Sequence, residues 1–229
     1  DVLNVAESFD NHFAAYGFWA PAAHDYVDMG ITDRLDTPEF AELCDIVDPY
    51  RYRARYTMPK YIVNATGDQF FTPDSWKLYF DDLPGEKYLR YMPNTDHGLT
   101  PDAYFELCSF HHAVINDTPR PVFDWHLEAD GNLVLECETR PEQVLLWQAT
   151  NPAARDFRLE EIGAAFASSA LAPEEDGIYR SHLQEPAEGW TALLIEVEFA
   201  NPGIAEPLVF TTGVSILPDT LPHEDTRRP

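Results

Sequence analysis

The run YIVNA at residues 61–65 decides the fold, because it is a short apolar, β-rich segment bounded by Pro59 and Gly67. A run of this kind is typical of a strand that is buried in a parallel sheet. Asp68 follows Gly67 directly, so a carboxylate stands where the predicted strand ends.

Further elements are predicted on the C-terminal side of this strand. Aromatic and apolar residues at helical spacing predict a helix over 72–83, residues 87–92 predict a second strand, and Thr100 with Pro101 begins a helix that runs to Ile115. This order of strand, helix, strand and helix predicts a right-handed α/β crossover.

Short helices are predicted upstream of the first strand. Thr37 is a natural N-cap with proline at the next position, and Asp48 before Pro49 repeats the device. The helices are expected to end near Gly17, Gly30, Val47 and Tyr56.

The second half of the chain has a different pattern. A polar segment bracketed by prolines at 117–121 predicts a domain boundary, with one domain over 1–118 and another over 119–229. Six alternating runs follow, separated by Pro, Gly and Asn turns, and they predict a small antiparallel β-sandwich of the immunoglobulin or fibronectin kind. The expected strands are 122–128, 133–138, 144–149, 178–183, 190–199 and 208–217.

Composition excludes several classes of function. The chain has 229 residues and a net charge of −25, from 40 acidic against 15 basic residues, and the two halves carry 20 acidic residues each. An acidic surface of this kind argues against binding nucleic acid through phosphate contacts. Since no apolar run approaches the roughly 18 residues that cross a bilayer, a membrane span is excluded.

Three cysteines imply no disulfide framework, and at most one bridge. Cys44 and Cys108 lie on apolar faces of predicted helices, where buried free thiols are expected. The adjacent His111 and His112 cannot both face one metal ion, and the spacing of cysteine and histidine matches no zinc motif. We therefore expect no metal and no other cofactor.

Asp68 and His97 are the candidate catalytic residues. Each follows one of the two consecutive predicted strands, and in a parallel sheet such loops meet at one edge. A carboxylate beside an imidazole is the acid and base arrangement of a Ser-His-Asp triad, and acid before histidine is the chain order of α/β-hydrolases. Asp74 is a competing acid, but its place in the first turn of a predicted helix explains it through the helix dipole. Asp96 is expected to orient the loop.

Aromatic side chains surround these positions in the sequence. Trp19, Phe70, Phe71 and Trp76 are candidates for the wall of an apolar substrate pocket near Asp68, with core packing as the equal alternative. Trp125, Trp147 and Trp190 are expected in the core of the sandwich, with exposed stacking on carbohydrate as the alternative.

Several segments carry a resemblance to a known family, the most specific being GDQFF at 67–71 and NTDH at 94–97. The others are YGFWAPA at 16–22, RLDTPEF at 34–40, DPY at 48–50, MPKYI at 58–62 and LPGEKYLRY at 83–91. Over nearly all of residues 1–118 the chain resembles the PhoPQ-activated pathogenicity-related protein family. The resemblance implies an α/β-hydrolase fold with Asp68 and His97 as acid and base, a β-rich C-terminal appendage, and a secreted or periplasmic location.

One part of the hydrolase pattern is missing. A nucleophile elbow of the G-x-S-x-G type and an oxyanion hole should precede the acid, and none of the seven serines lies in such a context. Ser215 comes closest, but it lies in a predicted strand after the histidine. We therefore predict that an N-terminal hydrolase segment, from the same gene or as a cleaved chain, supplies the serine.

Three functions stay open from the sequence. The leading one is the acid/base part of a secreted serine hydrolase that cleaves ester, amide or peptide bonds in a small molecule or peptide, with the sandwich as a docking or substrate-orienting module. The alternatives are a non-catalytic pseudo-hydrolase that acts in interaction or signalling, and a carbohydrate-binding module in residues 119–229.

Overall fold

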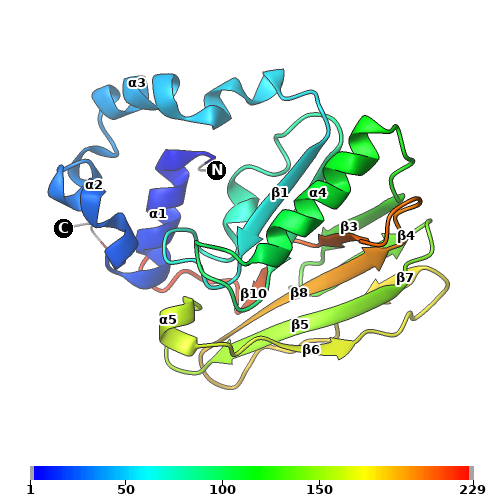
Figure 1. Ribbon diagram of the computed structural model, residues 1–229. Helices are drawn as coiled ribbons and strands as arrows, with labels where there is room; N and C mark the ends of the chain where they lie inside the picture. Colours follow the sequence, from blue (N-terminus) through cyan, green and yellow to red (C-terminus); the bar gives the residue numbers. More distant parts are fainter. Residues whose placement is uncertain (1–2, 227–229) are drawn as a thin grey trace.

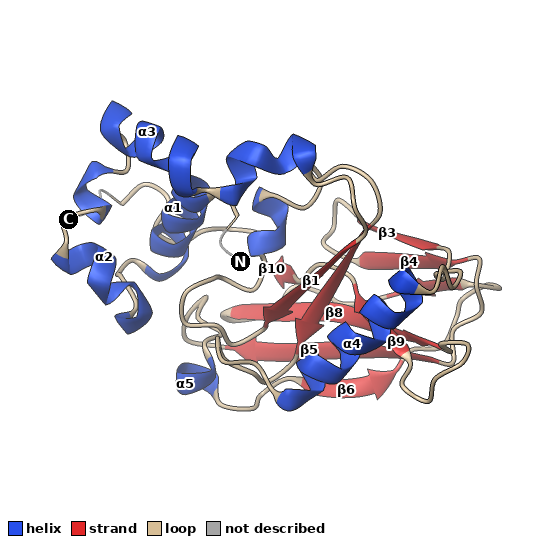
Figure 2. Cartoon of the chain, turned by 45° about the horizontal axis from the view of Figure 1, so that its top comes forward, coloured by secondary structure: helices blue, strands red, loops and turns tan. Residues whose placement is uncertain are grey.

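The computed structural model describes residues 3–226 of the chain and shows a mixed α/β protein with two sheets (Figure 1). The α-helices are α1 (Val5–Tyr16), α2 (His24–Asp28), α3 (Pro38–Val47), α4 (Pro101–Ile115) and α5 (Leu159–Ile162). Short 3-10 helices are η1 (Pro21–Ala23), η2 (Thr32–Arg34), η3 (Pro49–Arg55) and η4 (Ser75–Leu78). Helices α1 to α3 gather on one side of the strands, and α4 lies apart from them across the sheet (Figure 2).

The predicted parallel strand pair is present. Strand β1 (Lys60–Ala65) pairs in parallel with β2 (Lys87–Met92), in a register from Lys60 opposite Lys87 to Ala65 opposite Met92. In the described part of the chain β1 is the last strand at its end of the sheet, so no strand pairs with its other side.

The large sheet draws strands from both halves of the sequence. Its order is β1-β2-β9-β8-β5-β6, and β10 also pairs with β8. The other bounds are β5 (Gln143–Asn151), β6 (Ala167–Ala170), β8 (Trp190–Phe199), β9 (Leu208–Thr211) and β10 (Ser215–Leu217). The domain boundary at residue 118 stays a prediction. The large sheet contains strands from both sides of it, because β2 pairs with β9.

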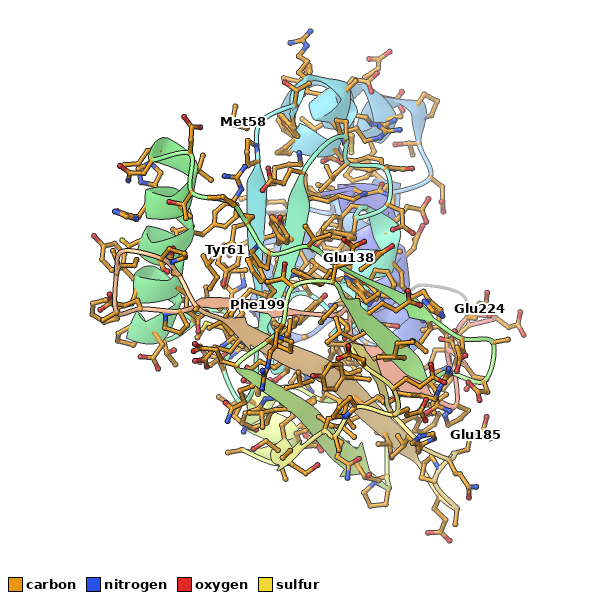
Figure 3. The ribbon with its side chains drawn as sticks, turned by 90° about the vertical axis from the view of Figure 1, so that its right-hand side faces the viewer. Met58, Tyr61, Glu138, Glu185, Phe199 and Glu224 are labelled. Atoms are coloured by element: carbon orange, nitrogen blue, oxygen red, sulfur yellow. The ribbon has the colours of Figure 1, made fainter. Side chains whose placement is uncertain are left out.

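The two halves of this sheet meet at a sharp bend. Strands β2 and β9 share a single register pair, Leu89 opposite Thr211. Figure 3 shows the cyan and teal strands β1 and β2 nearly upright, while the orange β8 runs obliquely to them.

A small antiparallel sheet completes the β-rich half. It has the order β3-β4-β7, with β3 (Phe123–Leu127), β4 (Leu133–Cys137) and β7 (Ile178–Arg180). Leu133 and Leu135 of β4 share one buried cluster with Leu193, Ile195 and Val197 of β8. Apolar burial between the two sheets thus provides the core of this half.

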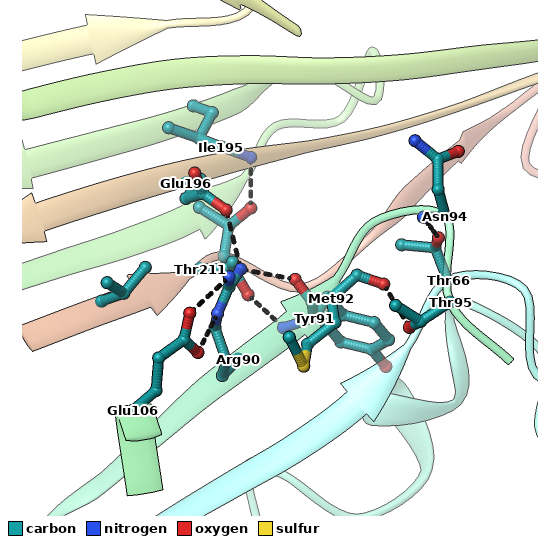
Figure 4. A network of polar contacts seen from close by, with 12 residues as sticks. Thr66, Arg90, Tyr91, Met92, Asn94, Thr95, Glu106, Ile195, Glu196 and Thr211 are labelled. Atoms are coloured by element: carbon teal, nitrogen blue, oxygen red, sulfur yellow. Dashed lines mark hydrogen bonds and ion pairs between the residues drawn. The ribbon is translucent and has the colours of Figure 1, made fainter. Parts of the chain in front are cut away.

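A buried ion-pair network holds the two halves together (Figure 4). Arg90 of β2 donates through Nε and Nη2 to both carboxylate oxygens of Glu106 on α4, at 2.6 and 2.9 Å. Its Nη1 reaches Glu196 of β8 at 2.7 Å. Because Arg90 is only 6% exposed, these charge-assisted contacts are shielded from water.

Three expectations from the sequence are wrong. The predicted helix over 72–83 is only the short η4, since tertiary contacts fix the segment: the indole N–H of Trp76 donates to Val214 O at 2.9 Å. Asp74 stands at the N-cap position of η4, but its side chain makes no capping bond there and is buried against Arg155, at 2.6 Å. Cys108 is exposed on α4, whereas Cys44 is buried as predicted.

Two strand predictions also need correction. The run 208–217 is interrupted at residues 212–214 and divides into β9 and β10. Strand β6 was not predicted, because its sequence ASSA has little β propensity and all four residues are exposed. In the part of the chain that is described, no helix has the length and apolar character needed to span a membrane.

Candidate functional site

The loop after β1 is held by close backbone packing. The Gly67 N–H donates to Thr95 O at 2.9 Å, and Gly67 O accepts the Leu159 N–H at 3.0 Å. A Cβ at Gly67 would lie 2.8 Å from Thr95 O and equally near the Leu159 backbone nitrogen. Only glycine permits this approach, so the acid loop is fixed between the histidine loop and the segment that follows β5.

Asp68 occupies the position directly after this glycine. Its Oδ1 accepts the backbone N–H groups of Phe70 and Phe71, at 2.6 and 3.2 Å. These bonds fold residues 68–71 into a turn closed by the carboxylate itself. Because Oδ1 is fixed by these two bonds, the orientation of the carboxylate is fixed, and Oδ2 is left to accept a hydrogen bond from another group.

His97 is the hydrogen-bond partner of Asp68 Oδ2. Its Nδ1 is 2.9 Å from Asp68 Oδ2, and the side chains of His97 and Asp68 are 63% and 8% exposed. The histidine loop is stabilised by Asp96, whose Oδ1 accepts the Gly98 N–H at 2.8 Å, and by Gln69, whose Oε1 accepts the His97 N–H at 3.3 Å. The structure thus brings Asp68 and His97 into contact, and Asp96 orients the loop as expected.

The pair has a defined chemistry. A carboxylate can only accept a hydrogen bond, so Nδ1 of His97 donates to Asp68, and in the neutral ring Nε2 has a free lone pair. Such an imidazole can take a proton from a hydroxyl at Nε2, while Asp68 stabilises the resulting cation.

Several serines of the chain make hydrogen bonds away from His97. No serine hydroxyl is a hydrogen-bond partner of His97 within residues 3–226. Ser109 Oγ donates to Pro207 O, Ser181 Oγ to Asn132 and Ser215 Oγ to Gly131 O. Ser215 lies in β10, so the sequence interpretation of it as a structural residue agrees with its position.

Two of the predicted substrate-binding aromatics flank the pair. The ring centroids of Phe70 and Phe71 lie 6.4 and 5.9 Å from that of His97. Trp19 packs on Phe9, at 5.7 Å between centroids, and Phe9 in turn contacts Phe70 at 5.7 Å. Trp19 therefore contacts His97 only indirectly, through Phe9 and Phe70. Substrate binding by Trp19, Phe70 and Phe71 stays a prediction.

Trp76, the fourth aromatic candidate, belongs to the core. It is 6% exposed and packs edge-on against Trp125, at 4.8 Å between centroids. Trp125, Trp147 and Trp190 are partly buried against the same cluster, which is shared by both halves of the chain and is not a core of the β-rich half alone.

A second histidine supports the site, and sequence reasoning missed it. His12 of α1 is 2% exposed; its Nε2 accepts the Ala20 N–H at 3.0 Å, so its Nδ1 donates to Phe70 O at 2.9 Å. Burial lowers the pKa of His12, which keeps the ring neutral. The only sequence signal was its place on the apolar stripe beside Phe9 and Phe13.

A large cavity lies away from the pair. It has a volume of about 950 Å³ and lies between α1, η2 and the C-terminal segment. Its wall carries the carboxylates Glu7, Asp10, Asp33, Asp36, Glu224 and Asp225. Neither Asp68 nor His97 lines this cavity, and the His97 side chain is open to the surface. Among the described residues, no cluster of three or more His, Cys, Asp or Glu side chains is arranged to hold a metal ion.

Comparison with known proteins adds a family and one relative. The model of the family described as PhoPQ-activated pathogenicity-related protein matches residues 1–158. The protein named "Autocrine proliferation repressor protein A", from Dictyostelium discoideum, is 35% identical to the chain over 248 aligned positions, covering 96% of the chain and 50% of the relative. The chain thus spans about half the length of this curated relative. No solved structure matches the chain significantly.

Proposed function

The chain belongs to the PhoPQ-activated pathogenicity-related protein family, as its motifs predicted, and from that premise we propose that it carries the acid and base of a secreted or periplasmic serine hydrolase. His97 takes the proton of a serine hydroxyl and returns it to the leaving group, and Asp68 orients the imidazole. The reaction is acyl transfer from an ester, amide or peptide bond of a small molecule or peptide. The 2.9 Å contact between His97 Nδ1 and Asp68 Oδ2 is the observation that carries this proposal.

The proposal places the nucleophile in a segment on the N-terminal side of these residues. Three observations support it. The chain spans half of its relative, β1 ends the sheet in the described part of the chain, and His97 is open to the surface. A segment that adds a strand beside β1 and brings a serine to Nε2 completes an α/β-hydrolase domain whose last part is residues 1–118.

The exposed apolar side chains of α4 also support the proposal of an N-terminal segment. Tyr104, Phe105 and Ile115 are 67%, 56% and 63% exposed. Large apolar side chains at this exposure on one helix favour burial against further protein. In this proposal residues 119–229 form the docking or substrate-orienting β-sandwich module, with β3-β4-β7 packed on the sheet that contains β5, β8 and β9.

The second candidate function is non-catalytic. The name of the relative, a repressor of autocrine proliferation, favours a pseudo-hydrolase that keeps the fold as a signalling or interaction protein. The two candidates differ in the residue at the nucleophile elbow, because a signalling protein needs no serine there.

The test uses the full-length protein and a fluorophosphonate probe, with masses measured under denaturing conditions. We expect labelling of one serine, and we expect His97→Ala to slow labelling by about 10²–10⁴-fold without unfolding the protein. His126→Ala is the control, because His126 is an exposed histidine on β3, away from α4 and from the candidate pair.

Two results would overturn the hydrolase. A His97→Ala protein that is labelled as fast as wild type shows that His97 is not the base. Intact wild-type protein that takes no label favours the pseudo-hydrolase.

A further inference from the structure

The connection between β5 and β6, residues 152–166, reaches both loops that carry the candidate pair. It leaves the β-rich half at Asn151 and approaches the acid loop, where the Leu159 N–H donates to Gly67 O at 3.0 Å. It then passes the histidine loop and enters β6 at Ala167. No other connection of the β-rich half makes hydrogen bonds to both loops in the described part of the chain.

Asn94 joins this connection to the histidine loop. Its Oδ1 accepts the Phe166 N–H at 2.9 Å, and its Nδ2 donates to Phe166 O at 2.9 Å. The Asn94 backbone N–H donates to Thr66 Oγ1 at 3.0 Å, as Figure 4 shows. Asn94 stands three residues before His97 in the left-handed region, with a φ of 57°, so its amide fixes the start of the histidine loop.

Arg155 joins the same connection to the segment that follows the acid loop. Its Nη2 lies 2.6 Å from Asp74 Oδ2, and the two side chains are 1% and 5% exposed. Burial by itself raises the pKa of Asp74, but the charge and hydrogen bond of Arg155, together with Lys77 and Thr72, outweigh it and lower the pKa below its usual value. Asp74 is therefore an ionised anchor six positions after Asp68.

This ion pair is poorly explained by stability alone. Arg155 Nε, Arg155 Nη1 and Asp74 Oδ1 are buried without a partner among the described residues. A buried pair with unsatisfied atoms contributes less than a well-packed apolar pair of the same size. The family match also continues past residue 118 as far as residue 158, so it includes Arg155. Placement of the segment that follows the acid loop gives this ion pair a role that stability alone does not explain.

We propose that Arg155 and Asn94 are positioning residues. Through them the connection from β5 to β6 holds the Asp68 and His97 side chains at hydrogen-bonding distance. The inference rests on the proposed hydrolase function, because it assigns a use to the pair. The β-rich half then has a role in the site, because its connection between β5 and β6 fixes the positions of the loops that carry Asp68 and His97.

The test measures the tautomer of His97 in full-length protein labelled with ¹⁵N-histidine, by ring ¹⁵N–¹H NMR at alkaline pH. In wild type we expect the Nδ1–H form, because Asp68 accepts that proton. Asn94→Gly removes the amide but keeps the left-handed backbone accessible, and Arg155→Ala removes the second anchor. In both variants we expect a shift toward the Nε2–H form and fluorophosphonate labelling slowed by roughly 10–100-fold.

Two further variants separate positioning from general stability. Asn132→Gly removes a buried amide whose Oδ1 accepts the Leu183 N–H at 2.8 Å, in the hairpin of β3 and β4. It should leave the His97 tautomer and the labelling rate unchanged. Arg155→Lys keeps one cation beside Asp74 and should restore both readouts, which also settles the case if Asn94→Gly fails to fold.

An unchanged His97 tautomer in folded Arg155→Ala protein would overturn the positioning role. Since the tautomer is read without turnover, this result is distinct from failure of the hydrolase proposal, which shows as an unlabelled wild-type protein with an intact Nδ1–H signal.

Discussion

At the scale of single residues, His12 makes stability depend on pH. Burial lowers the pKa of His12 in the folded protein below the ordinary value of 6.5. The unfolded chain therefore takes up a proton near pH 6.5 while the folded protein does not, so the free energy of unfolding falls as the pH drops below that value. The slope from this one group is at most about 1.4 kcal/mol per pH unit. The contribution of His12 to this pH dependence fades about one pH unit above 6.5, where the unfolded chain no longer binds the proton.

His12→Gln provides the comparison, since glutamine does not titrate and its amide oxygen can accept the Ala20 N–H. Asp68, Asp156 and Arg158 also act on His12, and they are present in both proteins. Urea unfolding between pH 8 and 5 should show a steeper loss for wild type than for the variant below pH 6.5. Parallel curves over that range would contradict the assignment.

The same scale shows how far the sequence predicts the site. Asp68 and His97 could be found because each follows a strand that an apolar run makes visible. His12, Asn94 and Arg155 could not, because their partners are a backbone carbonyl, a backbone amide pair and a carboxylate 58, 72 and 81 residues away. Contacts at such separations leave no local pattern.

At the scale of elements, two threonines at helix starts make a matched pair. Thr37 Oγ1 accepts the Phe40 N–H at 3.3 Å and so caps α3, whereas Thr100 makes no such bond at the start of α4. We expect Thr37→Ala to lower the free energy of unfolding by about 1 kcal/mol. Thr100→Ala should cost clearly less, because its hydroxyl is buried without a partner among the described residues. Equal shifts in the urea midpoint would show that capping is not the cause.

Elements were predictable where local chemistry and burial agree. Strands β1, β2 and β8 appear where apolar runs predicted them, because their burial and their propensity act in the same direction. The helix expected over 72–83 failed because Asp74 and Trp76 are held by Arg155 and Val214. Tertiary contacts override helical spacing there, and no local rule would have indicated it.

At the scale of the whole molecule, the two halves share one core. Trp76, Tyr79 and Phe80 from the first half are buried in one cluster with Val214 and Ile216 from the second. Neither half can lose this cluster without exposing apolar surface of the other. We therefore expect residues on both sides of position 118 to unfold together.

Arg90 tests this coupling, because it binds Glu106 before the predicted boundary and Glu196 after it. Arg90→Met leaves two carboxylates, each with 15% side-chain exposure, without their cation, and should lower the free energy of unfolding by about 3–5 kcal/mol. The urea transitions measured by tryptophan fluorescence and by far-UV circular dichroism should shift together, since both halves lose the same ion pairs.

The control is Arg120→Met. It removes a more exposed pair with Glu86, at 22% and 29% side-chain exposure, and should lower the free energy of unfolding by about 1 kcal/mol or less. Two separate transitions, of which Arg90→Met moves only one, would show that the halves unfold independently in spite of the shared sheet.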